Sequence, residues 1–473
     1  MLDELFTVMR RRRRPCWLVG GTVRDREMGR EAPDVDVVVD DDPAAVAAAV
    51  AAAAGLSWFP LSHEFGAYRV VGDCRHLDVA GLRGGDIATD LGMRDLTVNA
   101  MALPLAGGPL IDPFGGRDHL ARRRLVAVSD GIFVDDPLRL LRVARLAHTL
   151  GFGVDSRLRD RTRVDAGLLG GAAAERVLSE VALTLAVGRS AAAACLWDHL
   201  GLLPTLFPEI AALRGVQQSD FHHLDAYHHT LETARQVDEI IAQPGRWFGR
   251  AWQPLEERLA TPVDGVLSRP VALRLAALLH DIGKATTRGF DAQGRIMFWG
   301  HTTEGARMVR GVNRRLKLSS KAGALVRTVV GEHLSIGKLE REGGDTSRGM
   351  VRYLWDTAPW EPEVIMVSTA DRLATRGPLT GGARMLAQLA LASRLMARWW
   401  ERERVGLPRP PLDGDGLQAA LGLTPGPLLG EVLREVRLAT QAGEIDTAAG
   451  ALAVAREYLE QRSRPASGAV LGG

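Results

Sequence analysis

The stretch DVDVVVD at residues 34–40 constrains the fold of this chain more than any other part of the sequence. Its valines are strong strand formers, whereas Asp34 and Asp36 are poor ones and lie two residues apart, which in a strand places both carboxylates on the same face. Two unit charges about 4 Å apart repel by roughly 4 kcal/mol at an effective dielectric of about 20, and strand propensity spans only about 1 kcal/mol. Propensity therefore cannot offset the repulsion, and the stretch predicts that something else holds the two acids together.

The residues around this strand indicate what that is. CWLVGG (16–21) reads as a buried strand that ends in two glycines, which let backbone N–H groups approach a phosphate closely. Arg24 follows within one helical turn and can pair with a phosphate, and Asp78 lies on a later strand. Two or three carboxylates on adjacent strands form an oxygen-only site for Mg²⁺, which can activate a hydroxyl and stabilise a leaving pyrophosphate. An edge strand with solvated acids is the alternative, but it leaves Gly20, Gly21 and Arg24 unexplained.

Composition sets wider limits. At 473 residues with a net charge of +2, the chain is long enough for about three domains and is not a polycation. Its arginines cluster at 10–14 and 122–124, which suits phosphate or nucleic acid but equally a solvated surface. Cys16, Cys74 and Cys195 lie far apart and predict reduced thiols in the cytoplasm rather than disulfides or a metal pair. No apolar stretch reaches about 18 residues without a charge, so no membrane span is expected.

Strand and helix patterns alternate through the first part of the chain and give way to helical patterns from about residue 130. A hairpin is expected at 68–82, with Gly72-Asp73 near its turn. Further along, GRWFGRAWQP (245–254) indicates loops and RPPLDGDG (409–416) indicates a linker. The fold class is therefore an α/β head followed by a mostly α-helical remainder.

Several stretches, in order, resemble one enzyme family. Residues 18–40 (LVGGTVRDREMGREAPDVDVVVD) closely resemble the signature of the polymerase-β-like nucleotidyltransferases, in particular of class II tRNA nucleotidyltransferases and bacterial poly(A) polymerases. The further matches are RDLTVNAMAL (94–103), IDPFGGRDHLARRRL (111–125), the neck helix DDPLRLLRVARLAHTLGF (135–152) and the helix AERVLSE (174–180). The resemblance covers roughly residues 15–210 and implies a polymerase-β-like head followed by a helical neck and body.

The resemblance also implies a chemistry. Enzymes of this family add CMP, and some also AMP, from CTP and ATP to the tRNA 3′ end, and would grip the tRNA acceptor arm mainly through its phosphates. Asp34 and Asp36, with Asp78 as a third acid, match the catalytic carboxylates that hold Mg²⁺. The nucleotide-binding positions carried over are Gly20, Gly21, Arg24, Arg94, Asp95, Asn99, Asp136, Arg139, Arg142 and Arg145.

Two of these residues are implied to choose the base. The family reads the Watson–Crick edge of the incoming base with an Asp and an Arg three residues later, which match Asp136 and Arg139. A spacing of three in a helix places both on one face. A carboxylate accepts from the cytosine amino group and a guanidinium donates to its ring nitrogen or carbonyl, so the pair fits cytosine.

The chain departs from the family pattern in two places. The second motif usually begins Arg-Arg-Asp and here reads Met93-Arg94-Asp95, so one phosphate or ribose contact is expected to be lost. Family members that add the whole CCA end carry a longer flexible loop before this motif, which helps to switch the site from cytosine to adenine, and only GLRGGDIATDLG (81–92) stands there. This favours CC addition, and the alternative is that GLRGGD is itself a shortened working loop.

A second constellation lies in the helical half. RLAALLHDIGKATTR (274–288) places adjacent His and Asp side chains at the end of an apolar helix, where they can ligate a metal or orient a hydroxide. A lone histidine is usually structural, but six residues in the order His, His-Asp, His, His, Asp resemble the HD phosphohydrolase superfamily over about 220–380. These residues are His229, His280, Asp281, His301, His333 and Asp371.

The HD resemblance implies an all-helical domain that holds one or two divalent transition metals and hydrolyses a phosphoester. Appendages of this kind on tRNA nucleotidyltransferases are associated with 2′,3′-cyclic phosphodiesterase or phosphatase activity. Lys284 is predicted either to contact a phosphate or to be an exposed helix-end lysine, and His222, His223 and His228 are expected to lie outside the site.

The predicted domains are a nucleotidyltransferase head (1–128), a helical neck and RNA- and base-binding domain (129–215), an HD domain (216–385) and a helical segment (386–473) with a disordered tail from 465. Other functions stay open. A poly(A) polymerase shares the head motifs but usually carries a basic tail and no HD domain. A phosphohydrolase whose head only binds RNA would not need Asp34 and Asp36, and an alarmone synthetase-hydrolase would carry its HD domain first. The sequence predicts no oligomeric state.

Overall fold

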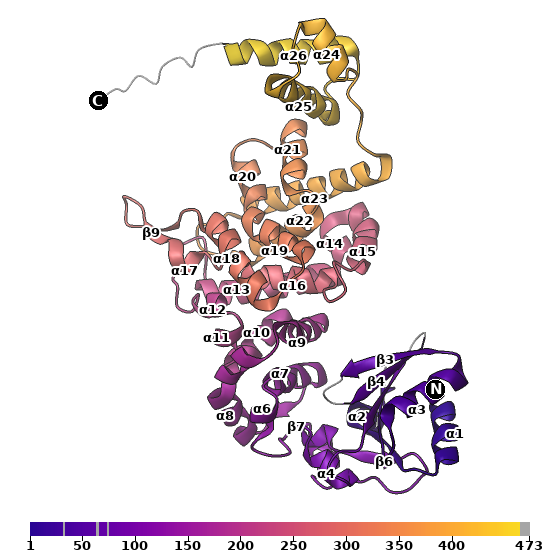
Figure 1. Ribbon diagram of the computed structural model, residues 1–473. Coiled ribbons are helices and arrows are strands. Elements are labelled where there is room, and N and C mark those ends of the chain that lie inside the picture. Colours follow the sequence, from indigo (N-terminus) through magenta and orange to yellow (C-terminus); the bar gives the residue numbers. More distant parts are fainter. Residues whose placement is uncertain (32–33, 63–65, 73–74, 464–473) are drawn as a thin grey trace. The chain divides into compact units, whose positions relative to one another are not determined.

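A six-stranded sheet organises the N-terminal part of the chain (Figure 1). Its strands are β1 (Cys16–Val19), β2 (Asp34–Val39), β3 (Ser57–Ser62), β4 (Ala67–Val71), β5 (His76–Gly81) and β6 (Ala102–Pro104), in the order β3-β4-β5-β2-β1-β6. β2 and β5 run parallel, and the other neighbouring strands run antiparallel. The predicted hairpin is confirmed as β4 and β5, although Asp73 and Cys74 lie outside the described residues.

The computed structural model describes residues 1–31, 34–62, 66–72 and 75–463. Unit 1 comprises Met1–Val187 with Ala192–Pro208, and unit 2 comprises Gly188–Ala191 with Glu209–Gly473. The tail predicted to be disordered from 465 lies outside the described residues, and the four predicted domain boundaries stay predictions. No described helix is both long and apolar enough to cross a membrane.

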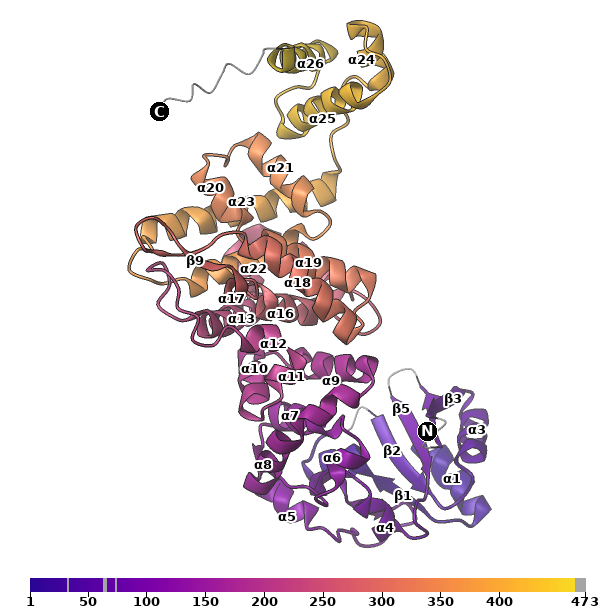
Figure 2. The same cartoon turned by 60° about the vertical axis from the view of Figure 1, so that its left-hand side comes forward.

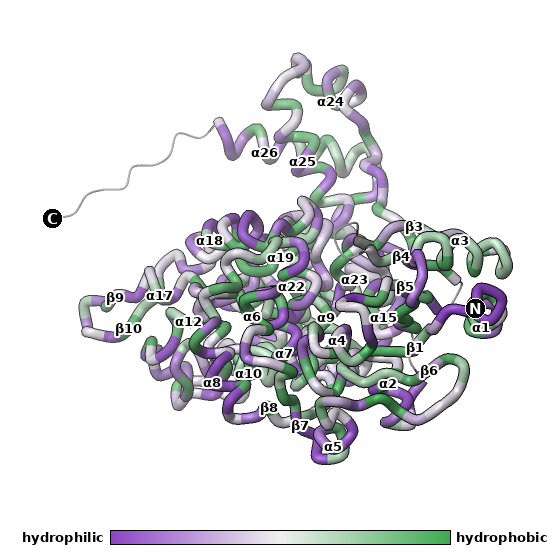
Figure 3. Tube along the Cα trace, turned by 60° about the horizontal axis from the view of Figure 1, so that its bottom comes forward, coloured by the Kyte–Doolittle hydropathy of each residue, from purple (hydrophilic) through white to green (hydrophobic). Residues whose placement is uncertain are grey.

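The sheet has one covered face and one open face. In β2, Val35 and Val37 are buried, whereas Asp34 and Asp36 point to the other side. The covering helix α3 (Pro43–Ala54), green along its length in Figure 3, packs against β3, β4 and β5, and Figure 2 shows it alongside the sheet. Asp42 caps its start by accepting from a backbone N–H, as short acidic side chains do at helix starts. The acids are thereby left on the face that α3 does not cover.

Helices complete unit 1, and they include α2 (Gly20–Glu27), α4 (Ile87–Gly92), α6 (Ile132–Asp135), α7 (Arg139–Leu150), α8 (Ser156–Asp165) and α9 (Ala174–Ala186). The single neck helix predicted at 135–152 is wrong at its start. Asp136 has extended backbone angles, φ −149° and ψ 103°, and α7 begins only at Arg139. The physical reason is Pro137, because a residue that precedes proline is pushed out of the helical region.

The described elements of unit 2 are helices, apart from the hairpin of β9 (Arg288–Phe290) and β10 (Ile296–Phe298). The longer helices are α13 (Ala226–Ala242), α16 (Arg269–Leu279), α18 (His301–Leu316), α19 (Ser320–Glu332), α21 (Ser347–Thr357), α22 (Glu361–Ala374), α23 (Gly382–Val405), α25 (Pro427–Ala442) and α26 (Ala448–Ser463). α13 packs against α16 and α22, and α19 packs against α16, α18 and α22. The predicted metal ligands lie in these five helices or directly after their C-terminal ends.

The loop predicted at 245–254 is wrong, because α14 (Pro244–Phe248) and α15 (Trp252–Ala260) occupy most of it. Pro244 and Pro254 lie in the first turns of these helices, where the backbone N–H has no intrahelical acceptor and proline is tolerated. The linker predicted at 409–416 is shorter than expected, because α24 (Gly414–Leu421) begins inside it.

Candidate active sites

Three carboxylates meet on the open face of the sheet. Asp36 on β2 lies directly opposite Asp78 on β5, and Asp34 lies opposite His76. Residues that are opposite one another or two apart share a face, and Asp34, Asp36 and Asp78 line one cleft of about 720 Å³. The structure thus brings the three predicted catalytic acids together, and their catalytic role stays a prediction.

Arg69 on β4 also lies on this face, and no sequence motif singles it out. Its Nε and Nη2 donate to the two carboxylate oxygens of Asp78 at 2.7 and 2.8 Å, and Nη2 lies 3.9 Å from Asp34 Oδ2. Bidentate pairs of this kind are strong charge-assisted contacts. Arg69 thus neutralises the charge of Asp78. The two remaining acids, Asp34 and Asp36, have the greater need for a cation.

The environment of Asp36 fits that need. Burial and the neighbouring carboxylate of Asp78 raise the pKa of Asp36 above its ordinary value, although nearby guanidinium groups partly oppose the shift. A Cβ at Gly20 would lie 3.1 Å from Asp36 Oδ2 and 3.0 Å from Arg94 Nη1, and its φ of +64° also favours glycine. A carboxylate that burial disfavours is stabilised by a bound cation, so the residues present fit Mg²⁺ at this position.

The predicted nucleotide-binding residues surround the acids, because all ten line the same cleft: Gly20, Gly21, Arg24, Arg94, Asp95, Asn99, Asp136, Arg139, Arg142 and Arg145. Arg24 on α2 pairs with Asp25 through two hydrogen bonds and donates to Asn99 Oδ1 at 2.9 Å. The partly buried Arg94 donates to Asp90 Oδ2 at 3.3 Å. Arginines already held in place can meet a triphosphate with little further ordering.

Asp95 is the buried centre of a chain of contacts behind these arginines. Its Oδ2 accepts from Arg142 Nε at 2.7 Å, and its Oδ1 accepts from the Leu96 N–H at 2.8 Å and from Asn99 Nδ2 at 3.3 Å. Burial alone would raise the pKa of Asp95, but Arg142 and the hydrogen bonds hold it well below its ordinary value. Asp95 therefore positions Arg142 and Asn99 at the cleft.

Replacing Asp95 with asparagine is expected to lower the free energy of unfolding by about 1–2 kcal/mol at neutral pH, because Arg142 loses its charged partner. The figure is modest because the Arg142 side chain is partly exposed. Since folding lowers the pKa of Asp95, its stabilisation is fully present above the unfolded-state pKa of about 4 and is lost as the pH falls below it. Urea unfolding between about pH 7 and about pH 3 should show the two proteins converging on the acid side, and a constant difference would contradict this assignment.

The two residues predicted to read the base line the cleft, but not as one helix face. Asp136 lies outside α7, where its Oδ1 accepts from the Leu138 N–H at 3.1 Å and its Oδ2 accepts from Arg176 Nη2 at 2.9 Å. Arg139 Nη2 donates to the backbone carbonyl of Met93 at 2.8 Å. The residue that replaces the usual family arginine thus still orients Arg139 through its main chain. Arg176, which lies in the AERVLSE stretch but was given no role of its own, orients Asp136.

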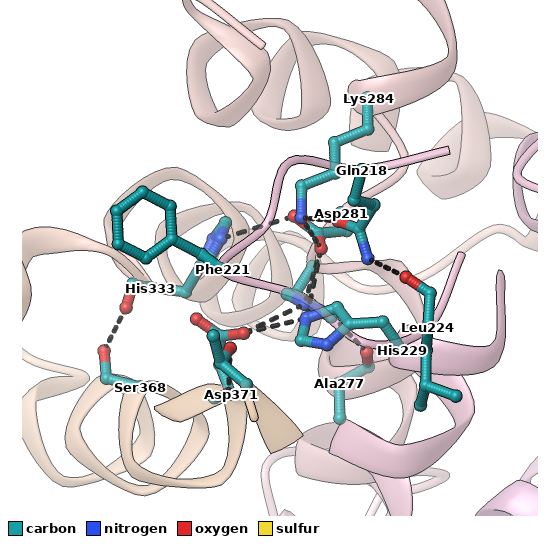
Figure 4. A network of polar contacts seen from close by, with 12 residues as sticks. Gln218, Phe221, Leu224, His229, Ala277, Asp281, Lys284, His333, Ser368 and Asp371 are labelled. Atoms are coloured by element: carbon teal, nitrogen blue, oxygen red, sulfur yellow. Dashed lines mark hydrogen bonds and ion pairs between the residues drawn. The ribbon is translucent and has the colours of Figure 1, made fainter. Parts of the chain in front are cut away.

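All six predicted HD residues converge in unit 2, and Figure 4 shows Asp281, His229 and Asp371 pointing toward one another. Asp281 is central: its carboxylate oxygens lie 3.1 Å from His280 Nε2, 3.4 Å from His229 Nε2, 3.4 Å from His301 Nε2 and 3.6 Å from His333 Nε2. Asp371 Oδ1 lies 2.9 Å from His229 Nε2. Most of these side chains come from the first turn or the C-terminal end of a helix, and five different helices contribute. The cluster therefore forms only when these helices pack together.

Hydrogen bonds of the Nδ1 atoms fix the orientation of three of the histidine rings toward the cluster. Nδ1 of His280, His301 and His333 lies 2.8, 2.8 and 2.9 Å from the carbonyl three residues earlier, so each Nδ1–H donates there and Nε2 carries the free lone pair. Among the described residues, the buried Nε2 atoms of His280 and His301 and both oxygens of Asp281 lack a well-formed hydrogen bond. The ligand atoms of His229, His280 and Asp371 lie within 4.8 Å of one another, and so do those of His280, Asp281 and His333. This nitrogen-and-oxygen set fits divalent transition metals.

A cleft of about 690 Å³ opens onto the cluster, and Lys284 lines it. Lys284 Nζ donates to Gln218 Oε1 at 2.7 Å and lies 2.5 Å from Asp281 Oδ2. The lysine is buried, so the alternative that it is an exposed helix-end residue is wrong. Its charge beside the cleft suits an anionic ligand.

His222 also lines this cleft, so the expectation that it lies outside the site is wrong. Its ring centroid is 4.8 Å from that of His229, and its buried Nδ1 has no hydrogen-bond partner among the described residues. His223 and His228 are exposed, and His228 pairs with the helix-capping Asp225. His222 therefore differs from His223 and His228 in its burial, which the positions of these histidines along the sequence do not reveal.

Two protein families match this chain, and so do several characterised proteins. Residues 16–89 and 84–126 match the Poly A polymerase head domain, and residues 226–376 match the HD domain. The A-adding tRNA nucleotidyltransferase of Deinococcus radiodurans is 34% identical over 451 residues, which cover 94% of this chain and 95% of that protein. The CC-adding tRNA nucleotidyltransferase of Thermus thermophilus is 34% identical over 457 residues, which cover 95% of each chain.

Solved structures match over nearly the whole length. A CCA-adding enzyme in complex with ATP superposes with a TM-score of 0.65 at 19% identity, covering 98% of this chain and 94% of that one. The Thermotoga maritima CCA-adding enzyme complexed with tRNA superposes with a TM-score of 0.60 at 19% identity, covering 97% of this chain and 94% of that one. At these identities the likeness establishes a shared fold.

Proposed function

This chain belongs to the tRNA nucleotidyltransferases, and on that premise we propose that it adds two cytidines, from CTP, to tRNA that lacks its 3′ end. Similarity alone does not choose the nucleotide, because an A-adding and a CC-adding relative are each 34% identical to this chain over 94% and 95% of its length. The choice rests on the segment that joins β5 to α4.

That segment, residues 82–86, is a tight turn. Arg83 Nε donates to the buried Asp90 at 2.8 Å, and Asp86 caps α4 by accepting from two backbone N–H groups. Gly84 has φ +69°, and a Cβ there would lie 2.2 Å from Thr89 Cγ2. Family members that switch to adenine carry a longer flexible loop at this place. The short turn of this chain, fixed by its hydrogen bonds, therefore supports CC addition.

The cleft residues divide the work of transfer. Asp34 and Asp36 would hold Mg²⁺, which when bound lowers the cost of forming the nucleophilic hydroxylate and of releasing pyrophosphate. The glycine backbone at the start of α2, with Arg24 and Arg94, binds the triphosphate. Asp136 and Arg139, each held by a neighbour, present a fixed acceptor and donor to the cytosine edge.

Incorporation of labelled CTP or ATP tests the nucleotide choice. We expect two cytidines on tRNA that ends at its discriminator base, and no adenosine on that tRNA or on one that already ends in CC. Addition of A to the CC-ended tRNA without prior C addition would make the chain an A-adding enzyme. Complete CCA synthesis would refute the argument from the short turn, and long A tracts on unstructured RNA would indicate a poly(A) polymerase.

For unit 2 we propose hydrolysis of a phosphoester, carried by the five-helix His/Asp cluster and the cleft beside it. The oriented Nε2 atoms would hold the metal, which when bound supplies a nucleophilic hydroxide near neutral pH. Lys284 then neutralises the phosphate charge, and Gln218 holds Lys284 in place.

A further inference from the structure

One row of residues crosses the sheet from its edge to the catalytic acids. Phe59 on β3 is directly opposite Arg69 on β4, Arg69 is opposite Asp78 on β5, and Asp78 is opposite Asp36 on β2. Residues directly opposite one another in paired strands point to the same face. Phe59 therefore extends the face that carries the acids, on the side away from β1.

The edge strand presents apolar side chains to solvent at this place. Phe59 and Leu61 are each 47% exposed, and Leu61 lines the cleft of the acids. Large exposed apolar side chains that adjoin a site commonly mark a binding surface. Helix α3 covers the other face of the sheet, so packing against α3 does not explain why Phe59 is aromatic.

The geometry of nucleotidyl transfer says which substrate reaches this end of the row. The attacking hydroxyl and the leaving pyrophosphate lie roughly in line on opposite sides of the α-phosphorus. The phosphate-binding glycines follow β1, which pairs with β2 on one side, whereas β5, β4 and β3 follow β2 on the other. The RNA end that carries the hydroxyl must then approach over β5 and β4, toward Phe59.

We propose that Phe59, with Leu61 beside it, is a stacking platform for the 3′-terminal nucleoside of the RNA that accepts the new nucleotide. The inference deepens the proposed transferase function and rests on it. An aromatic platform suits this substrate because every base has a π-face and stacking tolerates any sequence. The accepting base changes from tRNA to tRNA and again after each addition, so a hydrogen-bonding reader would fail where a flat ring succeeds. Arg69, held by Asp78, lies between the ring and the acids in the same row.

A matched pair of variants on one strand tests the platform. Phe59→Ser removes the ring from the acid-bearing face, and Trp58→Ser removes an aromatic side chain of similar exposure, 40%, from the opposite face, where Trp58 lies 5.7 Å from the Tyr68 ring. The probe is a minihelix RNA of the tRNA acceptor arm with 2-aminopurine at its 3′ end, titrated with the full chain in the absence of nucleotide. Stacking on the ring should quench the fluorescence of the wild-type complex.

We expect Phe59→Ser to lose most of the quenching and to weaken minihelix binding by about tenfold, while Phe59→Trp restores both. Trp58→Ser should behave as wild type, and the KM for CTP should change little in either variant. Equal binding and quenching by Phe59→Ser, equal loss in Trp58→Ser, or no quenching by the wild type would each overturn the platform. The proposed nucleotide choice fails separately, through the identity of the nucleotide incorporated, because the titration contains no nucleotide.

Discussion

Asp36→Asn should lower the initial rate of CMP transfer to tRNA on the order of a thousandfold or more, because an amide of the same shape cannot hold or balance a divalent cation. Among the three acids, Asp36 is the one whose substitution we expect to lower the rate of CMP transfer most. It is the acid beside Gly20 and Arg94. Asp78 is already paired with Arg69, whereas no arginine among the described residues makes a bidentate pair with Asp36. Incorporation of labelled CMP under single-turnover conditions measures the chemical step directly.

Asp40→Asn is the matched control for that experiment. Asp40 follows the same strand, but it is half exposed, pairs with Arg14 at 3.5 Å and does not line the cleft. We expect its variant to transfer CMP at a rate close to that of the wild type. Retention of more than about a tenth of the rate by Asp36→Asn would remove Asp36 from the catalytic set, and an equal loss in Asp40→Asn would point to strand stability instead.

The acid pair was predictable from the sequence because it depends only on local rules. Two residues of a strand share a face when they are two apart, and the valines between them fix the strand. Arg69 was not predictable in the same way. It meets Asp78 only through the register of β4 and β5, and nothing in YRVVG by itself specifies that register.

The conformation of Asp136 follows from a local rule. The sequence Asp136-Pro137 already disfavours a helical Asp136, and the structure places that residue in an extended conformation. The contact that then orients Asp136 comes from Arg176 on another helix. Such a long-range partner follows from the packing of α7 against α9, which spacing along the chain does not reveal.

The HD residues were predictable as a set and not as an arrangement. Their order along the chain identified all six, because each is the type of ligand that a metal needs. The carbonyl partners that set the histidine tautomers, the burial of Lys284 and the inward position of His222 depend on how five helices pack. Propensity and spacing carry no information about that packing, which is why the sequence predicts His222 to lie outside the site.

Asp281→Asn should empty the HD cluster of metal and abolish the phosphoester hydrolysis proposed for it. The Asp281 carboxylate faces four imidazole Nε2 atoms and Lys284 Nζ, so it is the anion that a divalent cation at this centre would contact. An asparagine keeps the volume but removes the charge, and its amide nitrogen is a donor with no lone pair to offer a metal ion. Metal content per chain, measured by plasma mass spectrometry after dialysis against metal-free buffer, should fall to below about a tenth of the wild-type value.

The accompanying activity measurement uses bis(p-nitrophenyl) phosphate as the probe, and a loss on the order of a thousandfold is expected. Asp356→Asn, at an exposed position of α21 in the same unit, is the matched control and should keep both metal and activity. CMP transfer should be unchanged in Asp281→Asn, because the cleft of Asp34 and Asp36 is built from residues of unit 1 alone. Wild-type metal content in Asp281→Asn would show that the remaining histidines and Asp371 suffice to bind the ion, and full hydrolysis by that variant would place the phosphoesterase chemistry outside this cluster.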